Sequence, residues 1–154
     1  MAVTPNTTFS SGAILTAAQQ NRFGRGVMVA PSSTTTGGTF TTEAQQLTTT
    51  FTAVSGRMYQ IVYFEPTLSG SASATCTARL REDSSVGAVI NTATVTLPTS
   101  FTTNLTVQSI FTAAASGSKN VSATLQASTG TGTTTRSGAT LRFPQLYVID
   151  IGAS

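Results

Sequence analysis

Histidine and tryptophan are absent from this 154-residue chain, and cysteine occurs once, at Cys76. The lack of histidine removes the commonest general base and the commonest metal ligand of proteins. A single cysteine excludes an intramolecular disulfide. Because Cys76 alternates with Ala74, Ala78 and Leu80, we expect a buried side chain rather than a nucleophile. The sequence therefore predicts no catalytic residues, no metal-binding residues and no cofactor.

Charged residues are also scarce, at 8% of the chain against about 25% in typical globular proteins. Eight basic and five acidic residues give a net charge of +3, and only Arg79 and Arg81 share one face of one expected strand. Nucleic-acid-binding proteins usually cluster basic charge with aromatic residues between. We therefore expect no nucleic-acid partner.

Long apolar runs are missing as well. None approaches the roughly 20 residues of a membrane span, and the polar segment 1–11 has neither the basic start nor the apolar core of a signal peptide. We expect no membrane partner, and synthesis in a cytoplasm without a secretory signal.

The five acidic residues offer two candidate catalytic pairs. Glu82 and Asp83 are adjacent in an expected turn, which favours solvated carboxylates. Glu65 and Asp150 would resemble a two-carboxylate glycosidase site if their strands brought them together, although an enzyme cleft usually carries more polar and aromatic side chains. The Gly/Thr segment 130–138 lacks the Lys-Ser/Thr ending and the helix of a phosphate-binding loop. These observations favour a protein that is not an enzyme.

Threonine, by contrast, fills about a fifth of the chain, far above its usual share. Its branched Cβ favours strands while its hydroxyl faces water. Apolar residues still make up 39%, enough for a buried core in a chain of this length.

The densest apolar run is Arg57–Glu65, in which Tyr59, Ile61 and Tyr63 alternate with residues that are also largely apolar. Successive strand residues point to opposite faces, so this pattern predicts a central strand covered on both sides, closed by Pro66. We expect Tyr59, Ile61 and Val62 to be deeply buried.

Further alternating segments precede and follow this run, separated by turn signals. They cover residues 27–30, 47–53, 74–81, 89–97, 105–111, 121–127 and 139–151, with expected loops at 66–70 and 128–138. About eight strands at fairly regular spacing predict an all-β fold, an antiparallel β-sandwich of jelly-roll type.

The first 25 residues lie outside this pattern. Residues 1–11 predict an extended polar arm, and the following segment predicts one helix of about two turns, because Thr16 and Gln19 match a capping box. So short a helix is marginal unless it docks on another surface. We therefore divide the chain into an N-terminal arm, residues 1–25, and a sandwich domain, residues 26–154. The candidate assembly contacts of the arm are Ile14, Leu15 and Phe23, which would dock on a neighbouring subunit or on the sandwich itself.

Three segments resemble small virion proteins of tailed bacteriophages, of the minor-tail or fibre-associated kind. They are TPNTTFSSGAILTAAQQNRFGRGV at the start, FTAVSGRMYQIVYFE in the middle and LRFPQLYVIDIG at the end. The resemblance implies a non-enzymatic structural protein of the virion, anchored by its arm among other virion proteins. A capsid decoration protein is the alternative within this class, and a carbohydrate-binding β-sandwich module is the alternative from another class.

Self-association is a further expectation, since a surface with few charges is poorly defended against it. Analogy with jelly-roll virion proteins favours a homo-oligomer, with a trimer as the first expectation. A glycan of the host cell surface is a further candidate partner.

Overall fold

The computed structural model of the protein describes residues 14, 16–20, 23–32, 37–134 and 143–153, and every structural statement below refers to them. Their elements are α1 (Ala17–Gln20), β1 (Gly26–Val29), β2 (Thr39–Phe40), β3 (Ala44–Ala53), β4 (Arg57–Gly70), β5 (Ala74–Glu82), β6 (Val89–Leu97), β7 (Thr103–Thr112), β8 (Gly117–Ala127), β9 (Gly132–Thr134) and β10 (Gln145–Ala153). No helix within these ranges is long and apolar enough to cross a membrane.

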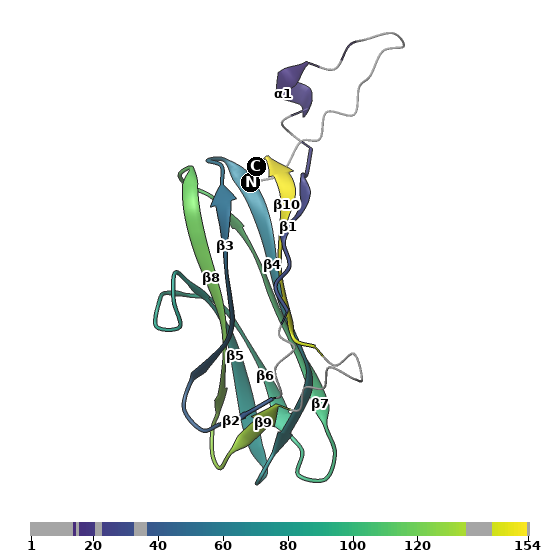
Figure 1. Ribbon diagram of the computed structural model, residues 1–154, viewed down its shortest axis with the longest axis vertical. Coiled ribbons are helices and arrows are strands. Elements are labelled where there is room, and N and C mark those ends of the chain that lie inside the picture. The colour runs from purple at the N-terminus through teal and green to yellow at the C-terminus, as the bar shows by residue number, and fades with distance from the viewer. Residues whose placement is uncertain (1–13, 15, 21–22, 33–36, 135–142, 154) are drawn as a thin grey trace.

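The strands form two antiparallel sheets packed face to face (Figure 1). One sheet has the order β1-β10-β4, with β7 and the short pair β9-β2 continuing from β4, and the other has the order β3-β8-β5-β6. The main pairs β1–β10, β3–β8, β4–β7 and β5–β6 are nested along the chain, as in a long hairpin rolled up so that its strands fall alternately in two sheets. This is the connectivity of a jelly roll, and it confirms the fold class predicted from the sequence.

Strand β4 is central in its sheet, as expected, but it differs from the prediction in two ways. It continues through Pro66 to Gly70, because the pairing with β7 shifts register between Glu65 and Leu68 and so accommodates the residue that lacks an N–H. Tyr59 and Ile61 are fully buried, whereas Val62 is only half-buried. The prediction for Val62 was wrong because a sandwich covers only one face of each sheet.

The alternation of the other strands places their side chains as predicted. Leu47, Phe51 and Ala53 of β3, and Ala78 and Leu80 of β5, point into the core between the sheets. Cys76 lies among them and is fully buried, which raises the pKa of its thiol to about 12. An aromatic group joins the two sheets at one end of the core: the ring of Tyr59 lies 5.0 Å from that of Phe51 and 5.6 Å from that of Phe111, measured between centroids.

Three smaller expectations need correction. The helix has one turn rather than about two, since α1 spans only Ala17–Gln20. Residues 66–70, expected as a loop, are strand, and the expected loop 128–138 contains β9. The two errors about strands have one cause: short segments rich in Thr, Ser and Gly have no pattern of their own, and it is the pairing of the end of β4 with β9 that orders both.

Candidate functional site

Two of the three candidate assembly residues, Ile14 and Phe23, are described, and they precede β1 at one end of the sandwich. Figure 1 shows α1 beyond the ends of the strands, on the side where β10 finishes. The exposed fraction is 92% for Ile14 and 51% for Phe23, and Leu15 lies outside the described residues. The single turn of α1 is closed by a hydrogen bond from the Gln20 N–H to the Thr16 carbonyl. The Phe23 N–H donates a further hydrogen bond to the Gln20 carbonyl. The structure therefore presents two apolar side chains of the arm to solvent.

A buried ion pair holds the base of this arm, and we call it the arm anchor: Arg57, Asp150 and the carbonyl of Phe23. Arg57 Nε lies 2.6 Å from Asp150 Oδ2, and Arg57 Nη2 lies 2.7 Å from Asp150 Oδ1. The same Nη2 donates to the carbonyl of Phe23 at 2.6 Å. The side chains of Arg57 and Asp150 are only 4% and 0% exposed. A bidentate pair at this depth fixes where the arm leaves the sandwich.

The electrostatics of the arm anchor favour the ionised pair. Burial alone would raise the pKa of Asp150, but hydrogen bonds from Arg57 and from the Gly152 N–H, together with the charges of Arg57 and Arg25, outweigh it and lower that pKa. The hydrogen bond to Asp150 raises the pKa of Arg57. Close packing supports the same contact, because a Cβ on Gly24 would lie 2.8 Å from the Asp150 carbonyl oxygen. Only glycine lets the chain pass this near to β10.

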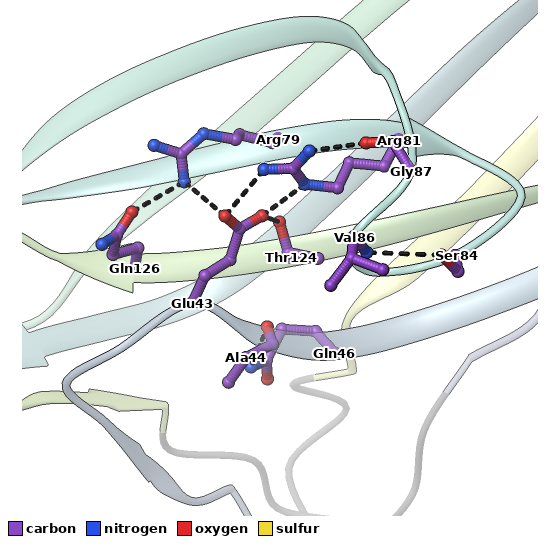
Figure 2. Close-up of polar contacts among 10 residues, drawn as sticks. All are labelled: Glu43, Ala44, Gln46, Arg79, Arg81, Ser84, Val86, Gly87, Thr124 and Gln126. Carbon is purple, nitrogen blue, oxygen red and sulfur yellow. Dashed lines mark hydrogen bonds and ion pairs between the residues drawn. The ribbon is translucent and has the colours of Figure 1, made fainter.

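A second group of charged side chains lies on the outer face of the four-stranded sheet (Figure 2). Glu43 accepts hydrogen bonds from Arg81 Nε at 2.6 Å and Nη2 at 2.8 Å, from Arg79 Nη1 at 3.1 Å, and from the Thr124 hydroxyl. Arg79 also donates to Gln126. The hydrogen bond from Arg81 is the largest cause that lowers the pKa of Glu43. This cluster ties the start of β3 across β8 and β5, so its first role is structural.

Arg79 and Arg81 lie on one face of β5, as predicted, whereas their contact with Glu43 was not predicted. These residues are more than 35 positions apart in the chain, and only the order β3-β8-β5 brings them together. No local signal would have found the contact.

The structure separates the candidate pair Glu65 and Asp150, and it pairs Glu82 with a lysine. Asp150 lies opposite Tyr59 in the pairing of β10 with β4, so Glu65 is six residues further along, about 20 Å away. Glu65 is fully buried in the core and accepts a hydrogen bond from the Tyr63 hydroxyl at 2.6 Å. Glu82 instead contacts Lys119 Nζ at 2.7 Å across the sheet. Over the described ranges, no three acidic or cysteine side chains are placed to hold a metal ion.

A cleft of about 220 Å³, which the sequence analysis did not anticipate, opens where the hairpin β5–β6 meets β7 and β8. Its lining is mainly apolar, with Ile90, Phe111 and Val121, and its polar rim carries Glu82, Lys119 and Asn120. The rim residues come from two strands of one sheet, while Phe111 comes from the other sheet.

No protein-family model matches the sequence, and no curated protein matches it. Among solved structures, a chain titled "CBM4 structure and function" is 15% identical, with 82% of this chain and 92% of that chain covered and a TM-score of 0.37. So distant a likeness carries no argument about function.

Proposed function

We propose that this protein is a non-enzymatic structural component of a bacteriophage virion, of the minor-tail or fibre-associated kind, and that its N-terminal arm attaches it to other virion proteins. The observation that carries the proposal is the arrangement at the end of the sandwich. Two apolar side chains of the arm, Ile14 and Phe23, are exposed, while the base of the same segment is bound by the arm anchor. The resemblance of three sequence segments to phage virion proteins supports the same assignment.

The energetics of docking favour this role. Full burial of a side chain such as Ile14 or Phe23 contributes about 1.5–3 kcal/mol. A one-turn helix is unstable alone and gains order from the surface on which it docks. Because Arg57 already holds the Phe23 carbonyl, part of the ordering of the arm is complete before docking.

The test uses two truncated chains, one starting at Phe23 and one starting at Gly26. Virions are prepared from hosts that supply either chain in place of the full-length protein, and incorporation is measured by immunoblot. We expect neither chain to be incorporated, since both lack Ile14 and the helical turn. Incorporation at the full-length level would place the attachment surface on the sandwich and contradict the proposal.

The same two chains test the arm anchor. The chain starting at Phe23 keeps the carbonyl that Arg57 binds and should melt close to the full-length protein. The chain starting at Gly26 loses that hydrogen bond to a charged donor, which contributes about 1.5–3 kcal/mol, and should melt at a lower temperature. Equal melting of the two would mean that water replaces the Phe23 carbonyl without loss.

A capsid decoration protein remains the alternative within this class, because an arm of this kind suits either location. Antibody labelling of virions, followed by electron microscopy, separates the two: label on the tail supports the proposal, and label over the capsid supports decoration.

Carbohydrate binding is the candidate from another class, and the cleft favours it. A partly buried aromatic ring, Phe111, lies there beside the amide of Asn120 and the charged groups of Glu82 and Lys119. Sugar recognition uses such a combination of apolar surface and a few directed polar groups. A glycan array probed with the wild-type protein and with Asn120→Ala tests it, and a signal lost in the variant would support this function.

A further inference from the structure

The two outer faces of the sandwich have opposite chemistry. On the four-stranded sheet, the outward side chains include many hydroxyls and the charged cluster of Glu43, Arg79 and Arg81. On the other sheet, the outward positions of β1, β10, β4 and β7 are largely apolar. We call this surface the apolar face, and its apolar members are Val27, Met58, Val62, Phe64, Ile110, Tyr147 and Ile149.

Strand register makes the apolar face continuous. One row crosses all four strands, and two further rows cross β10, β4 and β7. The rows are Val27–Ile149–Gln60–Ile110, Tyr147–Val62–Gln108 and Gln145–Phe64–Thr106. Neighbours across strands are about 5 Å apart, and successive rows are about 7 Å apart, so these side chains are in reach of one another. Val27 and Ile110, at opposite edges, are 60% and 59% exposed.

The same face carries no Asp, Glu, Lys or Arg at any of these paired positions. Its polar groups are the Tyr147 hydroxyl and the side chains of Gln60, Gln108, Gln145 and Thr106, each of which both donates and accepts hydrogen bonds. Such a surface can meet an identical surface without burying an unpaired charge and without opposing like charges. A partner that binds through charged groups would meet no charged side chain at these positions. The complementary partner is a second copy of this chain.

The dimensions of the apolar face agree with that partner. Four strands and three rows span roughly 15 Å by 20 Å, or about 300 Å², so the residues around the face would supply the larger part of the roughly 800 Å² that a standard interface buries on each subunit. The described part of the chain has one such face, so a contact between the faces of two copies is isologous and closes at two copies.

We propose that two copies of this chain associate through their apolar faces as a two-fold dimer. The proposal stands apart from the attachment function of the arm, which lies at the end of the sandwich rather than on this face (Figure 1). The sequence led us to expect a trimer by analogy with jelly-roll virion proteins, and the test below distinguishes a dimer from a trimer.

The test compares single charged substitutions on the two outer faces, two on the apolar face and one on the opposite sheet. Ile110→Glu adds a carboxylate to the apolar face on β7, and Val27→Glu does so on β1. Both side chains are more than half exposed, so the monomer should tolerate the change. The matched control is Thr94→Glu, which adds the same charge at an exposed outward position of β6, on the opposite sheet. Far-ultraviolet circular dichroism and melting confirm that all three variants fold.

Sedimentation equilibrium of the purified full-length proteins then measures association. We expect a dimer for the wild type and for Thr94→Glu, and a dissociation constant raised at least about tenfold by Ile110→Glu and by Val27→Glu. A wild-type monomer at about 100 μM, a trimer, or a dimer unaffected by both apolar-face variants would overturn the proposal.

The chain starting at Phe23 separates this interface from the arm. It should dimerise as tightly as the full-length protein even though we expect it to be excluded from virions. Loss of the dimer in this chain would show that association runs through the arm, and the apolar face would then not be the interface.

Discussion

Replacing Ile61 by alanine should destabilise the fold strongly, while the same treatment of its neighbour Val62 should not. Ile61 lies in the middle of β4, between β10 and β7, and its side chain points into the core with no exposure to solvent. Val62 is the next residue of the same strand and is half-buried on the opposite face. The two substitutions therefore probe the two faces of one strand at adjacent residues.

The expected magnitudes follow from burial. Ile61→Ala removes three carbon atoms from a filled core and leaves a cavity, and such changes destabilise by about 2–5 kcal/mol. Val62→Ala removes two carbon atoms that are partly in water already. At about 0.8 kcal/mol for each fully buried carbon, and less for a half-buried one, the loss should be about 1 kcal/mol.

Guanidinium chloride unfolding at low protein concentration measures both values, with the slope m checked for a two-state transition. Low concentration matters because Val62 belongs to the apolar face and would also report on dimerisation. A loss below about 1 kcal/mol for Ile61→Ala, or equal losses for the two variants, would refute the assignment of β4 as a strand with one buried and one outer face.

Two further predictions concern ionisable groups. Cys76 should react with iodoacetamide at pH 8 at least about 100-fold more slowly in the native protein than in urea, because burial disfavours its thiolate. Fast alkylation of the native protein would contradict the burial of Cys76. The substitution Cys76→Ser should lower stability only modestly. The lowered pKa of Asp150 means that its pairing with Arg57 stabilises the fold above the ordinary value of 3.8 and is lost as the pH falls toward the lower folded-state pKa. Asp150→Asn should therefore destabilise by about 3 kcal/mol at pH 7 and flatten the loss of stability below about pH 4, as measured by urea unfolding across pH. A variant as stable as the wild type at pH 7 would show that the buried pair contributes nothing.

Alternation along the chain predicted the core well. Over residues 47–53, 74–80 and 121–127 of β3, β5 and β8, every second side chain is apolar or small, and those side chains are the ones that meet between the sheets. The period of two is a local property of extended backbone, so it can be read without knowing which strands pair. The same reasoning predicted the burial of Cys76 from its neighbours in β5.

Predictions from the local residue pattern were wrong where strand pairing determines the structure. Pro66 reads as a strand end, yet the irregular register opposite β7 lets β4 pass through it. Val62 reads as core because it is apolar, yet the second layer needed to bury it is absent from the described structure on that side. Both errors concern what lies beside a strand, which periodicity within the strand does not contain.

The assembly role of Ile14, Leu15 and Phe23 stays a prediction. The apolar segment outside the strand pattern was recognisable in the sequence, and the exposure of Ile14 and Phe23 leaves them available for docking. The arm anchor was not recognisable, because Arg57 and Asp150 are 93 residues apart. The apolar face was equally hidden, since its members come from four strands that are far apart in the chain.

The sequence by itself determined the fold class, the buried side of most strands and the lack of histidine-based chemistry. These properties depend on residue type and on the period of two, both of which are local. Only the tertiary structure decided which charged groups pair, how the base of the arm is held, and that one outer face is apolar while the other is charged and rich in hydroxyls. Those properties depend on strand order and register, which bring together residues that are dozens of positions apart.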